Sequence, residues 1–116
     1  MGGERDLARL LAALDPELHP ERYHFSATTE LALQEGQFAI IREEEGLTAI
    51  GTDSSGQWAR ISLRVHSSLE AVGLTAEIAA RLAALGISAN IVAALHHDHI
   101  FVPWDRRTEA LEALRG

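Results

Sequence analysis

The sequence predicts an α+β fold, with amphipathic helices on one face of an antiparallel sheet. Three observations support this prediction. Residues 59–65 alternate between apolar and polar side chains, which is the pattern of a strand with one packed face. Apolar residues recur at helical spacing in three other segments. These helical segments are separated by several short strand-like runs, an order that favours helices layered on a sheet.

The first predicted helix covers residues 4–14. Its apolar side chains follow the i, i+3, i+4, i+7 spacing of one helix face: Leu7, Leu10, Leu11 and Leu14. Pro16 ends this helix, because a residue that precedes proline is pushed out of the helical region. Alternating residues then predict a half-buried strand over 22–27, and the polar stretch 28–36 is expected to hold a short helical turn.

Two further strands, 38–42 and 47–50, are predicted to form a hairpin. They flank an acidic run that ends in Gly46, a residue that can adopt the positive φ of a tight turn. We interpret the acidic run as solvated surface at the hairpin tip. The polar turn 52–57 separates this half of the chain from the strand 59–65.

After that strand, Ser67 and Glu70 have the spacing of a capping box, which indicates a helix start. A helix is predicted from Leu74 to the stop at Gly86, with one apolar stripe: Leu74, Ile78, Leu82 and Leu85. The following run, 87–95, is rich in small and apolar residues and is predicted to be a strand buried on both faces.

The chain is expected to end in a strand and a helix. The turn 96–99 returns the chain into a strand over 100–102, which Pro103 ends. Asp105 is expected to cap a last helix whose inward side chains are Ala110, Leu111 and Leu114. These elements suggest two incomplete ferredoxin-like units that share elements, one over residues 1–56 and one over 57–116.

Composition excludes several classes of function. The 116 residues include no cysteine, which removes disulfides, thiolate catalysis and cysteine metal sites. The net charge of −7 argues against nucleic-acid binding, and no apolar run approaches the roughly 20 residues of a membrane span. The N-terminus lacks the apolar core of a signal peptide, so we expect a cytoplasmic protein. All ten basic residues are arginine, which suggests a GC-rich bacterial genome.

Five segments carry a resemblance to a known family. Residues 58–75, 85–93 and 97–103, together with 43–48 and 23–25 upstream, resemble the small bacterial ACT-domain proteins of uncharacterised function. These proteins look related to the ACT pairs of amino-acid sensors. The resemblance implies a tandem of two ACT-like units with the ferredoxin-like fold, the first one degenerate. It also implies a regulatory module that binds an amino acid or a similar small carboxylate, and assembly as a homodimer.

The resemblance places the ligand site at the loop from His66 to Leu74. The residues implied are His66, Ser67, Ser68, Leu69, Val72, Gly73 and Leu74. Independently of the resemblance, His97 or His99 is expected to shape the ligand pocket. Gly73 matches the glycine that lets the backbone approach the ligand, whereas Glu70 and Trp104 depart from the family pattern. Backbone N–H groups at a helix start suit a carboxylate. The alternative is that Ser67 only caps the helix and Gly73 only turns the chain.

The turn His96-His97-Asp98-His99 suggests a second kind of site. If His97 and Asp98 form the turn, His96 and His99 face each other and can share a metal, with His66 or His24 as a third ligand. The alternative is that Asp98 and the imidazoles bond to the backbone at a tight turn, or that His99 packs half-buried. We predict no bound cofactor.

Two arginines on the polar face of strand 59–65, Arg60 and Arg64, can pair with a ligand carboxylate or neutralise glutamates in a dimer. Trp58 and Trp104 at strand ends can cover a pocket or pack at the sheet margin.

No catalytic motif is present: Ser67 and Ser68 follow His66, but adjacent strand residues point to opposite faces. The chain is therefore predicted not to be an enzyme. The alternative function is a domain that mediates oligomerisation and binds no ligand.

Overall fold

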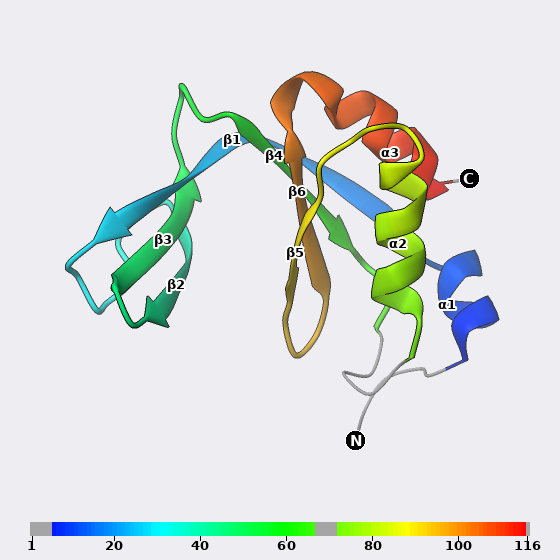
Figure 1. Ribbon diagram of the computed structural model, residues 1–116, viewed down its shortest axis with the longest axis horizontal. Helices are drawn as coiled ribbons and strands as arrows, with labels where there is room; N and C mark the ends of the chain where they lie inside the picture. The colour runs from blue at the N-terminus through cyan, green and yellow to red at the C-terminus, as the bar shows by residue number, and fades with distance from the viewer. Residues whose placement is uncertain (1–5, 67–71, 116) are drawn as a thin grey trace.

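The computed structural model describes residues 6–66 and 72–115, which form a curled sheet covered by helices on one face (Figure 1). Six strands pair in the order β2-β3-β1-β4-β6-β5, and every neighbouring pair is antiparallel. The strands are β1 (Pro16–Thr28), β2 (Gln37–Glu43), β3 (Gly46–Thr52), β4 (Trp58–Leu63), β5 (Asn90–Ala93) and β6 (Asp98–Pro103).

The described helices gather at one end of the sheet. They are α1 (Leu7–Ala12), α2 (Leu74–Ala83) and α3 (Arg107–Arg115), the last preceded by the 3-10 turn η1 (Trp104–Arg106). Their apolar stripes meet the inward face of β4 and β6 in a helix-side core, which includes Leu10, Ile61, Leu63, Ile78, Leu82, Ile100, Val102, Ala110 and Leu114. The predicted α+β class and the predicted inward residues of the last helix are confirmed.

The strand alternation also holds: Ala59, Ile61 and Leu63 face the helices, and each is fully buried. Gly73 is the N-cap of α2 and has a φ of 92°, which a residue with a side chain rarely adopts. The capping box predicted at residues 67–70 lies outside the described residues.

Strand β1 is much longer than predicted. Asp15, with a φ of 46°, ends the turn after α1, and β1 then begins at Pro16 rather than at residue 22. Leu18 pairs with Ile61 and Arg22 with Ala59, so β1 advances four positions while β4 advances two. This bulge contains Pro20, which has no N–H to give to the strand ladder. The proline and the bulge hide the strand pattern in the sequence.

The β2–β3 hairpin is confirmed, with a turn at Glu44 and Glu45 and a φ of 146° at Gly46. The segment 29–36 before it contains bends and a turn but no helical turn, so that prediction was wrong. Side chains there bond to nearby backbone N–H groups, as Thr28 Oγ1 does by accepting from Glu30 N. Such local bonds compete with helix formation.

Strand β5 corrects another prediction. It spans four residues at the sheet edge and is half-buried or exposed, whereas the sequence suggested residues 87–95 buried on both faces. An edge strand has a single neighbour, so its small apolar residues remain partly in water. Asp98 already belongs to β6 and pairs with Ala93, while His99 pairs with Val92. His96 and His99 therefore do not face each other across the hairpin.

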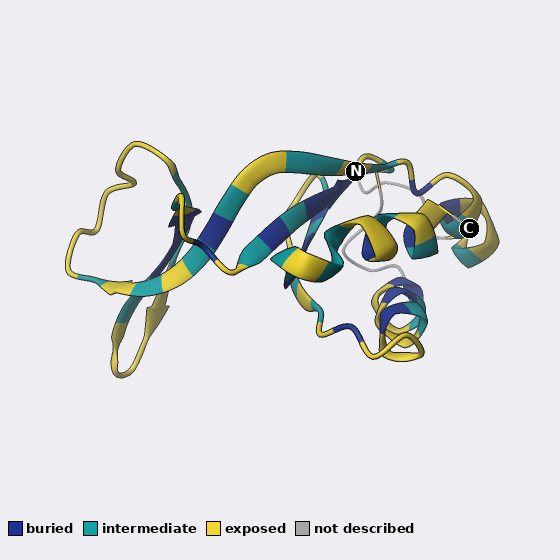
Figure 2. Cartoon of the chain, turned by 90° about the horizontal axis from the view of Figure 1, so that it is seen from above, coloured by how far each residue is buried: buried dark blue, intermediate teal, exposed yellow. Residues whose placement is uncertain are grey.

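The sheet face opposite the helices carries an aromatic cluster, defined by the rings of Tyr23, Phe25, Phe38, Trp58 and Phe101. Phe101 is fully buried at its centre. Phe38 of β2 also reaches the ring of His99 in β6, with 4.8 Å between centroids, although these strands are not neighbours. The sheet therefore curls, and Figure 2 shows the β2–β3 hairpin at the end away from the helices. This curl gives the open face a concave surface.

Candidate functional site

A cavity of about 300 Å³ lies on the open face near the end of β4. Its polar lining comes from three neighbouring strands, β1, β4 and β6, and from the turn before β6. The polar lining residues are Glu17, His19, Arg60, Ser62, Arg64, His97 and His99. We refer to it as the Arg60 cavity.

Two imidazoles share one buried hydroxyl in this cavity. Ser62 Oγ lies 2.8 Å from His19 Nε2 and 2.8 Å from His99 Nδ1. A hydroxyl has one hydrogen to donate, so Ser62 donates to one ring and accepts from the other. The other ring nitrogen of each histidine has no hydrogen-bond partner among the described residues and can serve a ligand as donor or acceptor.

Both histidines are held in the neutral form. Burial, and then the positive charge of Arg60, lowers the pKa of His99 from 6.5 to about 4. The same two causes, in the same order, lower the pKa of His19 below its ordinary value. Near neutral pH the imidazoles of His19 and His99 are therefore uncharged beside the guanidinium of Arg60.

The lowered pKa of His99 predicts a loss of stability in mild acid. Between pH 6.5 and about 4 the unfolded chain binds a proton that folded His99 does not bind. The free energy of unfolding should therefore fall as the pH falls through this window, and it should be fully retained above it. We expect the His99→Gln variant to lose less stability than the parent protein between pH 7 and 4.5, as measured by urea denaturation. Parallel pH profiles for the two proteins would contradict this.

Arg60 is one of two arginines that line the cavity, and its guanidinium is unusually placed. Its Nη1 donates to the hydroxyl of Tyr23 at 2.8 Å, and its guanidinium lies 4.3 Å from the centroid of the Phe38 ring. Its Nε is buried and has no hydrogen-bond partner among the described residues. Among residues 6–66 and 72–115, no carboxylate forms an ion pair with Arg60. A guanidinium that lines a cavity and has no described counter-ion is suited to receive an anion.

Arg64 lines the same cavity but, unlike Arg60, is paired with carboxylates. It donates from Nη1 to Glu17 Oε1 at 2.7 Å, and its Nε lies 3.7 Å from Asp15 Oδ2. Its side chain is largely exposed, so these pairs are screened by water. Of the two arginines predicted to pair with a ligand carboxylate, Arg60 is therefore the one that has no described carboxylate partner.

The structure brings some of the predicted site residues together. His97 and His99 line the Arg60 cavity, and the ring centroid of His66 lies 6.3 Å from that of His97. Val72 is 83% exposed, whereas Leu74 is buried in the helix-side core.

Gly73 approaches the side chain of Leu7: a Cβ added there would lie 3.2 Å from Leu7 Cδ2. Ser67, Ser68 and Leu69 lie outside the described residues. The role of this loop in binding stays a prediction.

The predicted metal pair does not form as expected, because His99 pairs with Val92. The ring of His96 lies instead near that of His66, with 6.0 Å between centroids. In the part of the chain that the structure describes, no three histidine, aspartate or glutamate side chains are grouped as metal ligands.

Sequence reasoning missed His19 and Ser62. His19 precedes the strand predicted over 22–27, and the bulge at Pro20 concealed the extension of β1. The alternation of Glu17 and His19 with apolar Leu18 was the available signal. Ser62 was placed on the polar strand face, but its two imidazole partners depend on pairings with distant parts of the chain.

Several solved structures are similar to this chain, and two of them illustrate the range of similarity. A Vibrio cholerae protein of unknown function, described as a possible transport protein, is 42% identical, with 92% of each chain covered and a TM-score of 0.77. An Agrobacterium tumefaciens protein is 15% identical over 79% of this chain and 78% of its own, with a TM-score of 0.63, and thus shares the fold. No curated protein matches significantly. None of the described helices has the length and apolar character needed to cross a membrane.

Two family models, both described as ACT domain, match the chain. One matches residues 2–66 and the other residues 54–116, so the two ranges together span nearly the whole sequence. The first range alone covers more than half of the 116 residues. The resemblance noted from the sequence is therefore confirmed, and this chain belongs to the ACT-domain family, with an ACT domain matched in each half.

Proposed function

We propose that the chain is a non-catalytic regulatory module that binds an amino acid or a similar small carboxylate in the Arg60 cavity. ACT domains are in general regulatory modules that bind small molecules. The observation that carries the proposal is the guanidinium of Arg60, which lines a cavity and has no described carboxylate partner. The chain has 17 acidic and 10 basic residues, yet this arginine has no described carboxylate partner, and such a cation can pair with an external anion.

The surrounding groups complete the proposed site. A carboxylate beside Arg60 can accept from the guanidinium, while the free ring nitrogens of His19 and His99 supply further polar contacts. The ring of Phe38 and the hydroxyl of Tyr23 both contact the guanidinium, which limits the side-chain entropy lost on binding. The glutamate in the lining, Glu17, is already paired with Arg64 and adds little repulsion.

The proposal is tested by thermal unfolding with each of the twenty amino acids and with small carboxylates. A ligand at about 100 times its dissociation constant stabilises the folded state by about 2.7 kcal/mol, which raises the melting temperature by several degrees. Removing a hydrogen bond to a charged group should weaken binding by roughly 10- to 100-fold. We therefore expect Arg60→Met to lower the temperature rise by at least about half at this ligand concentration.

Arg64→Met is the matched control, because it removes the same charge from the same cavity but from a residue that is already paired. It should keep most of the response. Each variant is compared with its own melting temperature without ligand, so a loss of basal stability does not affect the result. An equal rise in Arg60→Met and the parent protein would reject the site, and no rise with any carboxylate would reject the proposal.

Assembly as a homodimer and a boundary between residues 56 and 57 also remain proposals. The first is supported by the family, since ACT domains commonly dimerise. The edge strand β5 also has only one neighbour in the sheet. If the alternative of an oligomerisation domain without ligand holds, stability should depend on protein concentration and not on any small molecule.

A further inference from the structure

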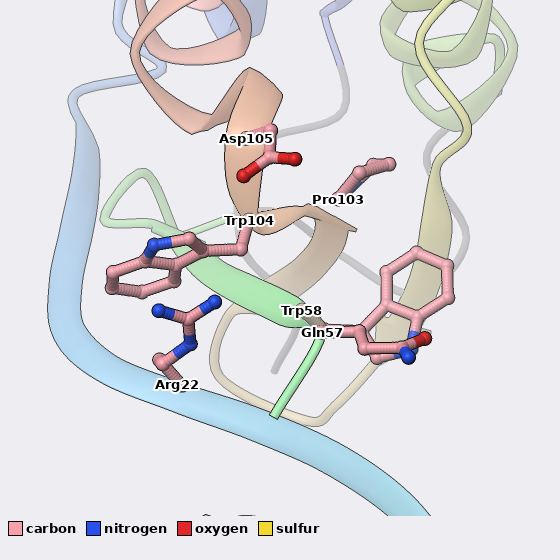
Figure 3. A pocket seen from close by; sticks show the side chains of 6 residues that line it. All are labelled: Arg22, Gln57, Trp58, Pro103, Trp104 and Asp105. Atoms are coloured by element: carbon pink, nitrogen blue, oxygen red, sulfur yellow. The ribbon is translucent and has the colours of Figure 1, made fainter. Parts of the chain in front are cut away.

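A second cavity, of about 430 Å³, lies at the opposite end of β4 (Figure 3). It is lined by Arg22, Gln57, Trp58, Pro103, Trp104 and Asp105, none of which lines the Arg60 cavity. The N–H of Trp104 donates to the carbonyl of Gln57 at 2.9 Å, which ties the end of β6 to the turn before β4. The cavity is therefore framed by backbone that the sheet holds in place. We refer to it as the tryptophan cavity.

Its electrostatics centre on one indole between two cations. The guanidinium carbon of Arg22 lies 4.5 Å from the centroid of the Trp104 ring, and that of Arg107 lies 3.8 Å from it. Figure 3 shows the Arg22 guanidinium beneath the ring. Among the described parts of the chain, neither arginine forms an ion pair. Two like charges on one ring without a described counter-ion favour the approach of an anion.

Arg22 is oriented to receive that anion. Its Nε donates to the carbonyl of Gly56 at 2.8 Å, which fixes the plane of the guanidinium. The two terminal amino groups make no hydrogen bond to the described residues and can bind a carboxylate through two parallel bonds. Arg107 instead donates from Nη1 to the carbonyl of Trp104 at 2.8 Å, and it contributes mainly its positive charge to the site.

The other residues that line the cavity indicate the size, polarity and charge of the ligand. Trp58, Pro103 and Trp104 present apolar surface, and the two indoles stand at opposite sides of the close-up. The volume lies within the range of small-molecule sites, roughly 300 to 1,000 Å³. Asp105 places a negative charge in the lining, which disfavours a dianion such as a phosphate monoester over a singly charged carboxylate.

We infer that the tryptophan cavity is a second binding site, separate from the Arg60 cavity, for a small monoanionic carboxylate joined to an aromatic or bulky apolar group. Arg22 binds the carboxylate, and the walls of Trp58, Pro103 and Trp104 cover the apolar group. This inference does not depend on the proposed function of the Arg60 cavity.

The chain offers a local readout, because its only two tryptophans both line this cavity. Titration with 3-phenylpropionate should change the tryptophan fluorescence in a saturable way. The neutral 3-phenylpropanamide has nearly the same shape without the charge, and phenyl phosphate carries a second charge. Both should bind at least about 10-fold more weakly, because one lacks the charge-assisted bonds and the other meets Asp105.

Two variants test the residue roles. Arg22→Gln should weaken 3-phenylpropionate binding by roughly 10- to 100-fold. Asp105 is exposed, so its replacement should not disturb folding. Asp105→Asn removes a negative charge that repels the ligand carboxylate, and it should therefore tighten binding. Glu35→Gln, which removes one charge from an exposed turn, is the control and should leave the affinity unchanged.

No saturable fluorescence change, or equal affinity for the acid and the amide, would overturn the inference. Weaker binding in Asp105→Asn would overturn it as well. Arg60→Met should leave the fluorescence titration unchanged, so failure at one cavity is distinguishable from failure at the other.

Discussion

Replacing Phe101 by alanine should lower the free energy of unfolding by about 3–5 kcal/mol, as expected for truncation of a fully buried phenylalanine. The ring contacts Tyr23 and Phe25 edge-on, with centroid distances of 5.5 Å and 5.4 Å, and it also contacts Phe38. Alanine would leave a cavity on the open face of the sheet, where no helix can collapse into it. Urea denaturation at neutral pH measures the change.

Phe25→Ala is the matched control, because this ring belongs to the same cluster but is 38% exposed. It should cost less than half as much. An equal cost would mean that the open face is not a true core. Should the alanine variant fail to fold, Phe101→Leu retains most of the volume and should cost less than about 1.5 kcal/mol.

The same substitution bears on the proposed site. Phe101 packs against Phe38 and Tyr23, and these two rings flank the guanidinium of Arg60. We therefore expect Phe101→Leu to weaken the carboxylate response of the Arg60 cavity more than its small cost in stability would suggest. The aromatic packing of the open face therefore also fixes the position of the Arg60 guanidinium.

Gly56→Ala should also destabilise strongly, by about 1–3 kcal/mol or more, since it forces atoms into a packed region. A Cβ at Gly56 would lie 2.7 Å from the carbonyl carbon of Tyr23 and 2.8 Å from its nitrogen, and closer still to its carbonyl oxygen. These are backbone atoms of β1, which cannot rotate away as a flexible side chain would. The midpoint of urea denaturation should fall accordingly.

Ser54→Ala tests whether the effect belongs to the contact rather than to the turn, because Ser54 is exposed in the same turn. It should change stability by less than about 0.5 kcal/mol. Coincident unfolding curves for the two variants would refute the steric explanation. Gly56 also accepts the hydrogen bond from Arg22 Nε, so Gly56→Ala should weaken aromatic carboxylate binding in the tryptophan cavity.

Local patterns determined much of the fold. The alternation from Ala59 to Leu63 predicted both the strand and its buried face, and the apolar spacing predicted α2 and α3. Gly46 marked the hairpin because a positive φ is needed there. These features depend on residues close in sequence, whose periodicity or turn chemistry is visible in the chain itself.

The errors occurred where long-range pairing overrides local pattern. Strand β1 passes through Pro20 because a bulge against β4 absorbs the missing N–H, and no local signal shows that bulge. Strand β5 is short and partly exposed because it lies at the sheet edge. The turn residues alone likewise do not predict the hairpin register, in which His99 pairs with Val92 rather than facing His96.

The sequence by itself therefore determined the fold class, the family and the candidate cations, since helical and strand periodicity, family motifs and the polar strand face are all local. Only the tertiary structure decided which of these arginines pair with a carboxylate of the protein and which can bind an anion. Arg64 meets Glu17 and Asp15, whereas Arg60 meets rings from β1 and β2 and no described carboxylate. The physical reason is that charge compensation depends on which side chains the pairing of distant strands brings within a few ångströms.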